Sequence, residues 1–523
     1  MKRTTWFVLA VIVIGIVCIV YFYSKNCATD ESELKTNINS KDIVYQDAYI
    51  FSCSNEKISF ICDGEKIEYK GKPENEFTGV ANIEIEDGKI KSIKSKPDII
   101  NGTLASFTNQ NITFSSGESN ELLNDQIPIY DVSGEEISEI DFGQLVLGGE
   151  NIDLVMENGK VCAVLRKSNP DLSFVRVLLK QGDETVWPQV TLLSNEKLVI
   201  NGHSDLGKSL DVGQYFTDNN ISSMEISSSD NYILFNGKKY EGDFIVTRFD
   251  NGFSVVNKIQ LEEYVKYVLP SEMPIGFTKE ALKAQAVCAR TFACSQMKNA
   301  TYAMYGANLD DSTSYQVYNA SGRFDVTDAA VDETQGEVIT CNGQLITCYY
   351  FSTSGGKTED MEVWGSDTPA FIKKVESIDD NSAYFKWCAT LDVTKYTDSE
   401  YGRAKGITVN SISESGYVLS LTVEYENGTL VFTKENDIRK ELGKYLTRTQ
   451  LNDGTSRDNL TMIPSACFTL EKISDNEYKL QGSGFGHGIG MSQYGADKLG
   501  SSGYTYEDII CYYYNDVKVV KRN

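Results

Sequence analysis

Glu272 is the acidic residue whose sequence setting best suits proton transfer. It lies in residues 268–274 (VLPSEMP), with apolar neighbours on both sides and a proline at each end of the short motif. Prolines restrict the backbone, and burial beside Leu269 and Met273 would raise the pKa of the carboxyl into the range of a general acid that works near neutral pH. The local sequence also allows two other interpretations, a contact at a helix terminus or a surface turn.

Arg290 follows on the edge of an alanine-rich stripe that also carries Gln285. A guanidinium on a mostly buried face needs an acceptor, because an unpaired buried charge is costly. Two acceptors remain open at this point, an internal group of the protein or a bound ligand.

Two polar loops are candidates for ligand contacts. Residues 352–358 (STSGGKT) include Ser354 and follow an expected strand, so their backbone N–H groups and hydroxyls suit a polar ligand. They lack the upstream glycine of an ATP-binding P-loop. Residues 481–496 (QGSGFGHGIGMSQYGA) carry glycine at every second position from 482 to 490, which predicts a strand bare on one face that a ligand or another backbone can approach. This run includes His487, which either contacts a sugar or holds a loop, and Gln493.

The elements that must position these side chains are helices and short strands. Apolar spacing predicts helices over residues 260–268 and 278–298, separated by a proline-bounded break. Residues 42–165 show short alternating runs that indicate an antiparallel β module, with a Ser/Asn-rich loop at residues 101–120. The turn signals of this module are Asp63-Gly64, Asp87-Gly88 and Asn158-Gly159. The fold class is α+β with strands dominating.

Composition limits the classes of function. The chain has 523 residues, 41% of them apolar, so two or more globular domains are expected. A net charge of −25 argues against binding nucleic acid. Only two histidines occur, which leaves little room for a metal site built from several imidazoles.

The N-terminus predicts a membrane anchor. Residues 6–23 form an uncharged apolar run of 18 after Lys2 and Arg3, just long enough to span a bilayer as a helix. A cleaved signal peptide is the alternative, but the apolar run is long for one and no small-residue cleavage site follows closely. We therefore expect a single-pass protein of the cell membrane whose C-terminal part lies outside the cytoplasm. Residues 1–23 are then a cytoplasmic stub and anchor, and residues 24–41 are a tether.

The cysteines do not indicate a disulfide framework. Of twelve, Cys18 lies in the expected span, which leaves an odd number outside the cytoplasm. Cys341 and Cys348 flank the hairpin signal Asn342-Gly343, whose register holds them too far apart to bridge. We expect most of the cysteines to be small buried apolar residues.

Five segments together resemble the stage II sporulation protein D (SpoIID/LytB) family. In chain order they are residues 261–274 (LEEYVKYVLPSEMP), 280–293 (EALKAQAVCARTFA), 314–318 (SYQVY), 349–359 (YYFSTSGGKTE) and 484–496 (GFGHGIGMSQYGA). The resemblance covers about residues 172–518. It implies a SpoIID-like catalytic domain at residues 171–523, preceded by a β-rich domain of unknown role at residues 42–170.

The resemblance implies a membrane-anchored lytic transglycosylase that cuts the MurNAc–GlcNAc bonds of denuded peptidoglycan strands and leaves 1,6-anhydro-MurNAc ends, in cell-wall remodelling or sporulation. The family glutamate falls on Glu272 as the catalytic residue. Arg290, Ser354, His487 and Gln493 match polar positions of the family motifs and become candidates for substrate binding.

Metal is not expected. Some family members bind zinc in a Cys/His loop before a Gln-Val-Tyr sequence, but residues 310–315 (DDSTSY) hold neither thiol nor imidazole here. We predict no metal and no cofactor. Two alternatives belong to other classes, a wall-bound enhancer of an N-acetylmuramoyl-L-alanine amidase and an adhesin whose β-rich N-terminal half binds partners. The expected partners are peptidoglycan strands and a cell-wall amidase.

Overall fold

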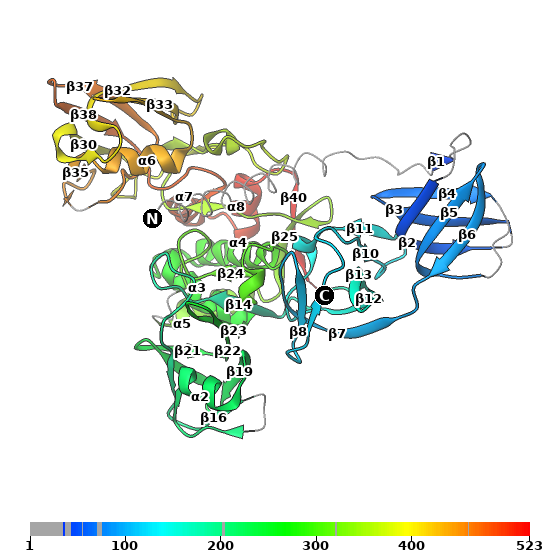
Figure 1. The fold of residues 1–523 in the computed structure, drawn as a ribbon. Helices are drawn as coiled ribbons and strands as arrows, with labels where there is room; N and C mark the ends of the chain where they lie inside the picture. Colours follow the sequence, from blue (N-terminus) through cyan, green and yellow to red (C-terminus); the bar gives the residue numbers. More distant parts are fainter. Residues whose placement is uncertain are drawn as a thin grey trace. The chain divides into compact units, whose positions relative to one another are not determined.

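The computed structural model describes residues 35–36, 43–54, 56–70, 76–200, 204–318, 322–458 and 460–522. These residues form two compact units (Figure 1). Of the described residues, unit 1 holds 265–292 and those from 322 onward, and unit 2 holds those from 35 to 264 together with 293–318. The span predicted at residues 6–23 lies outside the described residues. No helix of the described part is long and apolar enough to cross a membrane.

Unit 2 begins with a six-stranded sheet in the order β1-β4-β3-β2-β5-β6. Its strands are β1 (Lys35–Thr36), β2 (Ile43–Cys53), β3 (Lys57–Cys62), β4 (Glu65–Lys70), β5 (Gly79–Glu86) and β6 (Lys89–Ser95). Alternating residues such as Ile50, Phe60 and Ile83 are fully buried in its core. Asp63 and Asp87 both have a positive φ, so the two-residue turns predicted from Asp-Gly are confirmed.

A second sheet of seven strands follows in the order β11-β10-β13-β12-β7-β8-β9. The strands are β7 (Ile99–Phe107), β8 (Asn111–Phe114), β9 (Ser119–Glu121), β10 (Ile129–Asp131), β11 (Ser138–Ile140), β12 (Asn151–Glu157) and β13 (Lys160–Arg166), with a 3₁₀ turn at Phe142–Gln144. The loop predicted at residues 101–120 is therefore wrong. Leu104, Ile112 and Phe114 alternate with polar residues and are buried, so the apolar pattern decides the structure over the Ser/Asn-rich composition.

The remaining strands of unit 2 form a seven-stranded sheet and a four-stranded sheet, in the orders β17-β16-β19-β22-β23-β14-β24 and β18-β15-β20-β21. Their bounds are β14 (Phe174–Leu178), β15 (Thr191–Leu193), β16 (Leu198–Ile200), β17 (Ser204–Asp205), β18 (Ser209–Asp211), β19 (Ser223–Ser228), β20 (Tyr232–Phe235), β21 (Lys238–Glu241), β22 (Asp243–Phe249), β23 (Gly252–Gln260) and β24 (Leu309–Asp310), with helix α2 (Val212–Asn219) and a 3₁₀ turn at Ala303–Tyr305.

The predicted domain boundary at residue 171 does not coincide with a boundary between the two units. Arg176 on β14 is buried, and its Nη1 donates to the carbonyl oxygen of Ala105 on β7 at 3.1 Å. Strand β14 is thereby tied to the preceding sheet, and residues 171–264 belong to unit 2. The domain bounds at residues 42–170 and 171–523 stay a prediction.

Unit 1 is built on the two helices predicted from the sequence. Helix α3 (Leu261–Glu272) and helix α4 (Lys279–Gln296) each cross from one unit to the other along their length. Around them lie α5 (Asp325–Glu333), β25 (Glu337–Cys341), β26 (Gln344–Leu345), β27 (Tyr350–Phe351), β28 (Gly356–Lys357), β29 (Glu376–Ser377), β39 (Met491–Ser492), α7 (Gln493–Ser501), α8 (Tyr506–Tyr513) and β40 (Val517–Lys521). Strand β25 pairs with β26 through the predicted Asn342-Gly343 turn.

The part of unit 1 between β29 and β39 is a β-rich module, drawn in yellow and orange with helix α6 (Glu435–Gly443) in Figure 1. A five-stranded sheet, β36-β35-β30-β38-β37, and a four-stranded sheet, β31-β32-β33-β34, share one core that includes Trp387 and Leu421. The bounds are β30 (Trp387–Asp392), β31 (Thr397–Asp398), β32 (Gly402–Ile412), β33 (Val418–Tyr425), β34 (Gly428–Phe432), β35 (Leu446–Leu451), β36 (Ser456–Arg457), β37 (Phe468–Lys472) and β38 (Glu477–Gly482), with a 3₁₀ turn at Val393–Lys395. Another 3₁₀ turn, at Met361–Trp364, precedes the module. The structure is thus β-rich α+β, as predicted.

Candidate functional site

Glu272 is the last residue of α3 and is half-buried. The neighbours predicted to surround it, Leu269 and Met273, are buried, and the N–H of Met273 donates to the carbonyl oxygen of Leu269. Pro270 lies inside the helix and provides no N–H, and the hydroxyl of Ser271 donates to the carbonyl oxygen of Tyr267. The carboxyl therefore stands at the end of a rigid, buried helix with part of its surface accessible. Its raised pKa stays a prediction.

The segment after Glu272 is held by helix α7. The N–H of Thr278 donates to Oδ1 of Asp497 at 2.8 Å. The rings of Phe277 and Tyr494 meet edge to face, with their centroids 4.9 Å apart. These contacts join the motif that carries Glu272 to the motif that carries Gln493, although the two are far apart in the sequence.

Gln493 begins helix α7 and is only 5% exposed. Its Nε2 donates to Oε1 of Gln285 on α4 at 3.5 Å. Ser492 caps the same helix by accepting a bond from the N–H of Gly495. Gln493 thus contributes to packing between α4 and α7. Its contact with substrate stays a prediction, and the burial of the side chain does not favour it.

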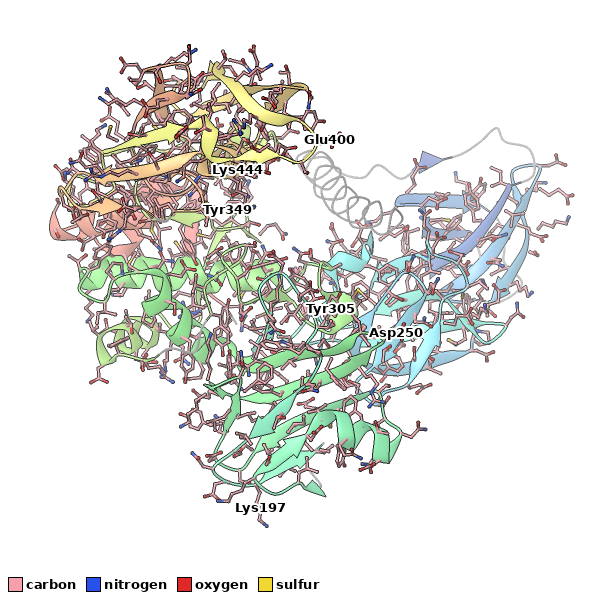
Figure 2. The ribbon with its side chains drawn as sticks, turned by 60° about the vertical axis from the view of Figure 1, so that its left-hand side comes forward. Lys197, Asp250, Tyr305, Tyr349, Glu400 and Lys444 are labelled. Atoms are coloured by element: carbon pink, nitrogen blue, oxygen red, sulfur yellow. The ribbon has the colours of Figure 1, made fainter. Side chains whose placement is uncertain are left out.

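The glycine-rich run is not a strand, so that expectation is wrong. Strand β38 ends at Gly482, and the glycines at 484, 486, 488 and 490 all have φ between 78° and 108°, which residues with side chains rarely adopt. The close backbone approach predicted for these glycines is confirmed. A Cβ on Gly490 would lie 2.0 Å from the carbonyl oxygen of Tyr349, which is one of the residues labelled in Figure 2. A Cβ on Gly488 would lie 2.4 Å from the hydroxyl of Tyr417.

His487 lies within this run and packs against two aromatic rings. Its ring centroid is 5.6 Å from that of Phe351 and 5.1 Å from that of Trp364. Nδ1 accepts a hydrogen bond from the N–H of Ile489 at 3.0 Å. Burial lowers the pKa of His487 to about 3, the charge of Arg439 acts in the same direction, and a hydrogen bond with the backbone of Tyr350 opposes them. The imidazole is neutral near pH 7, and these contacts favour the interpretation in which it holds the loop.

Ser354 is fully buried and binds a carboxyl that the sequence did not single out. Its N–H donates to Oδ2 of Asp379 at 2.5 Å, and its Oγ accepts a bond from the N–H of Gly356. Asp379 also accepts bonds from the hydroxyls of Ser377 and Ser492. Burial raises the pKa of Asp379 to about 6, while the bonds from Ser492, Ser377 and Ser354 lower it. The two polar loops are therefore joined by one buried carboxyl.

Arg290 is fully buried in helix α4. Its Nη1 donates to the carbonyl oxygen of Glu337 at 3.1 Å and its Nη2 to that of Val331 at 3.3 Å. These bonds connect α4 to the end of α5 and the start of β25. Of the two alternatives left open by the sequence, they favour structural pairing over a contact with substrate.

Comparison with known proteins agrees with the resemblance carried by the five sequence motifs. A family model described as stage II sporulation protein (SpoIID) matches residues 249–341. Stage II sporulation protein D of Bacillus subtilis is 34% identical over 284 residues, which make up 50% of this chain and 75% of that protein. The chain belongs to the stage II sporulation protein D family.

Other relatives extend the similarity of this family member. An uncharacterised protein of Brachyspira hyodysenteriae is 30% identical over 342 residues, covering 64% of this chain and 85% of that protein. The amidase enhancer of Bacillus subtilis is 31% identical over 333 residues, covering 55% of this chain and 45% of that protein. A second family model, described as a domain of unknown function (DUF8618), matches residues 369–490, which include the β-rich module of unit 1.

One group of side chains in this SpoIID-family chain has ligand spacing for a metal ion among the described residues. It consists of Asp47, Glu157 and Cys162, whose ligand atoms lie within 4.8 Å of one another. The ammonium group of Lys96 binds both carboxylates and is itself buried. Because a lysine already supplies the positive charge there, this group does not fit a resident metal.

Proposed function

We propose that this protein is a lytic transglycosylase of the bacterial cell wall. Membership of the SpoIID family supports a role at the wall. The observation that carries the proposal is the position of Glu272, a half-buried carboxyl at the end of the buried helix α3, in the segment that matches the family glutamate. Arg290, Ser354 and Gln493 are buried and internally bonded, which makes Glu272 the best-placed proton donor among the predicted site residues.

One carboxyl is sufficient for this reaction. Protonated Glu272 gives its proton to the oxygen between MurNAc and GlcNAc, and the bond from that oxygen to C1 of MurNAc breaks with its electron pair going to the oxygen. The resulting carboxylate then takes the proton of the C6 hydroxyl as O6 bonds to C1 and closes the 1,6-anhydro ring. No water is consumed and the carboxyl ends protonated, so no second carboxylate is needed as nucleophile or base.

The proposal includes membrane anchoring through residues 6–23, on the strength of their composition and the preceding Lys2 and Arg3. An anchor of this kind would keep the enzyme beside the wall that it acts on. Extraction of cell membranes with high salt and then with detergent tests this part, and release by salt alone would contradict it.

Product analysis tests the proposed reaction. The purified full-length protein is incubated with glycan strands freed of stem peptides, and anhydro-MurNAc ends are measured by mass spectrometry. We expect Glu272→Gln to lower the rate by at least about a hundredfold, because an amide cannot donate the proton. Glu262→Gln, on the same helix α3 and also half-buried, is the matched control and should retain activity. Equal product yield from Glu272→Gln and wild type would refute the assignment.

A second candidate function is enhancement of a cell-wall amidase. It is supported by the similarity to a protein named amidase enhancer. In this case the protein would raise the rate at which an added N-acetylmuramoyl-L-alanine amidase releases stem peptides, and Glu272→Gln would raise it equally well. Release measured with both proteins and intact sacculi separates the two functions.

A further inference from the structure

The β-rich module of unit 1 contains a cavity of about 360 Å³ on its five-stranded sheet. Strands β30, β35 and β38 pass side by side beneath it, since Cys388 on the central strand pairs with Gln450 on one neighbour and with Gln481 on the other. The cavity is lined by Lys386, Trp387, Cys388, Gln450, Leu451, Asn452, Lys479, Gln481 and Gly482. It therefore crosses three adjacent strands, a width of about 10 Å.

The charge of this lining is opposite to that of the whole chain. Lys386 and Lys479 are its charged members, and it contains no acidic residue. The chain carries 74 acidic against 49 basic residues. A larger cavity of unit 2, about 500 Å³, shows the opposite case, with five acidic residues and no lysine or arginine. A pocket lined by cations on such an acidic protein is suited to an anionic ligand.

Neither lysine is neutralised by the described part of the protein. Within the described ranges, no carboxylate lies within ion-pairing distance of Lys386 or Lys479. Glu471 stands opposite Lys479 on the outer strand β37 without forming an ion pair with it, and lies outside the cavity lining. Lys386 is exposed, with its ammonium group 4.9 Å from the centre of the Phe385 ring, and Lys479 is half-buried. Neither positive charge is therefore balanced by a carboxylate of the described residues.

The uncharged polar groups of the cavity narrow the class of ligand. Gln450, Gln481 and Asn452 are exposed, and their side-chain amides bind no other group in the described part of the chain. Each amide offers both donors and an acceptor. Such groups match the hydroxyls and acetamido groups of an amino-sugar polymer, and the two ammonium groups match carboxylates carried along it.

We propose that this cavity binds the carboxylate-bearing glycan strand, with Lys386 and Lys479 facing lactyl carboxylates of MurNAc residues and the amides facing the sugar edges. This inference rests on the proposed function, because it takes the substrate to be glycan without stem peptides. A strand stripped of its peptides exposes a carboxylate on every MurNAc, whereas a peptide-bearing strand has that group tied up in an amide bond. The cavity would thus select the denuded strand.

The cavity is connected to the motifs around Glu272 by one short segment. Gly482 belongs to its lining, and the carbonyl oxygen of Gly484 accepts a bond from Nε1 of Trp387. The chain then passes through the glycine run to helix α7, whose Asp497 binds the N–H of Thr278. A ligand in the cavity contacts the start of the same segment whose end holds the motif of Glu272.

Binding of three polymers tests the proposal. Full-length Glu272→Gln protein, which avoids turnover, is titrated with denuded glycan strands, with the same strands after conversion of their carboxylates to methylamides, and with wall teichoic acid as a phosphate polymer. We expect the denuded strands to bind best. The double substitution Lys386→Ala/Lys479→Ala should weaken their binding by about fivefold, and added salt should reduce the difference.

Lys405→Ala is the matched control, since Lys405 is an exposed lysine on β32 of the other sheet of the module and lies outside the cavity lining. It should bind as the parent protein does. If the alanine pair lowers the thermal midpoint, Lys386→Gln/Lys479→Gln replaces it. Unchanged affinity of the cavity variants, equal binding of the methylamide strands, or stronger binding of teichoic acid would each overturn the proposal.

These outcomes are distinct from failure of the proposed function. Absence of anhydro products together with lysine-dependent binding would refute the catalytic assignment alone. Formation of anhydro products with no effect of the lysine substitutions on binding would refute only the proposal that the cavity binds the strand. In the active protein, the double substitution should raise KM for long strands about fivefold and leave kcat unchanged, because it removes binding contacts and not the proton donor.

Discussion

Asp379 is fully buried, and its pKa of about 6 lies above the ordinary value of 3.8. Between these values the folded protein binds a proton that the unfolded chain does not. The contribution of Asp379 to stability is therefore fully present below about pH 4 and is lost as the pH rises through 6. Between pH 4 and pH 7 the free energy of unfolding of wild type should therefore fall by up to about 3 kcal/mol more than that of Asp379→Asn, which does not titrate. Urea unfolding at several pH values measures this difference.

The control for this prediction is Asp380→Asn. Asp380 is exposed and pairs with Lys498 at the surface, so its substitution should change the free energy of unfolding little at any pH in this range. Asp379→Ala should behave differently from Asp379→Asn, because it leaves the buried N–H of Ser354 without this acceptor and removes one hydrogen-bond partner from the hydroxyls of Ser377 and Ser492, at a cost of about 1–3 kcal/mol. Parallel curves for wild type and Asp379→Asn would contradict the raised pKa.

His487 responds to pH in the opposite direction. Its pKa of about 3 lies below the ordinary 6.5, so the unfolded chain binds a proton in this range that the folded protein does not. Stability from the neutral imidazole is present above pH 6.5 and is lost as the pH falls toward 3. His487→Asn keeps an acceptor for the N–H of Ile489 but does not titrate, so its thermal midpoint should fall less than that of wild type between pH 7 and pH 4. An equal fall of the thermal midpoint in both proteins would contradict a lowered pKa of His487 in the folded protein.

Among the elements, the glycine run has the strictest steric demands. Gly490 has φ of 78° and would place a Cβ 2.0 Å from the carbonyl oxygen of Tyr349, whereas Gly343 has φ of 80° and nothing within 4 Å. Both alanine substitutions incur the left-handed backbone strain of about 1–2 kcal/mol. Gly490→Ala adds a clash with backbone, so we expect it to lower the free energy of unfolding by at least about 2 kcal/mol more than Gly343→Ala. Equal losses in denaturant titrations would show that this segment can shift.

The contact between helix α7 and the segment after α3 is expected to position Glu272. Asp497→Ala removes the acceptor for the N–H of Thr278, and we expect kcat on denuded strands to fall about tenfold with little change in KM. Asp497→Asn keeps an oxygen acceptor and should restore most of kcat. A change confined to stability, with kcat unaffected in the folded protein, would show that the contact is structural only.

Turns and helices could be predicted from neighbouring residues in the sequence. The features that the sequence did not predict depend on contacts between residues far apart in the chain. The Asn-Gly and Asp-Gly turns and the helix predicted at residues 260–268 depend on neighbouring residues, and the structure has them. The break expected at the prolines is wrong at Pro270, because helix α3 continues through this residue to Glu272. The glycine run failed as a strand because its conformation is set by close packing against Tyr349 and Tyr417. Asp379 had no local pattern, since its donors Ser354 and Ser492 come from segments far away in the sequence.

At the scale of the whole molecule, compact units and sequence motifs do not share boundaries. The matched SpoIID region at residues 249–341 takes in chain from both units, and helices α3 and α4 each have residues in both. The helix that carries Glu272 therefore starts in unit 2, most of whose strands lie outside the family model. Composition predicted more than one domain but not this division, because it depends on which strands pair and not on where the motifs lie.

The ten cysteines of the described residues differ in accessibility across the molecule. Cys511 is exposed, whereas Cys62, Cys162, Cys288, Cys294 and Cys348 are buried. Burial raises the pKa of the Cys62 and Cys162 thiols to about 12, so these thiols are both shielded and protonated. We expect iodoacetamide at pH 8.5 to label Cys511 first in the native protein and the buried set only after unfolding, as site-resolved mass spectrometry would record.

This order of labelling would test how a cysteine-rich chain is protected from oxidation at the location proposed for it, outside the cytoplasm. Disulfides are the usual use of cysteine there, but thiols buried as apolar residues are protected by the packing itself. Cys511→Ser should remove the fast-labelled site and leave the thermal midpoint within about 1 °C of wild type, because the exposed thiol contributes little packing. Labelling of Cys288 or Cys348 as fast as Cys511 would mean that the core around helix α4 opens readily, and the protection would then have to come from another source.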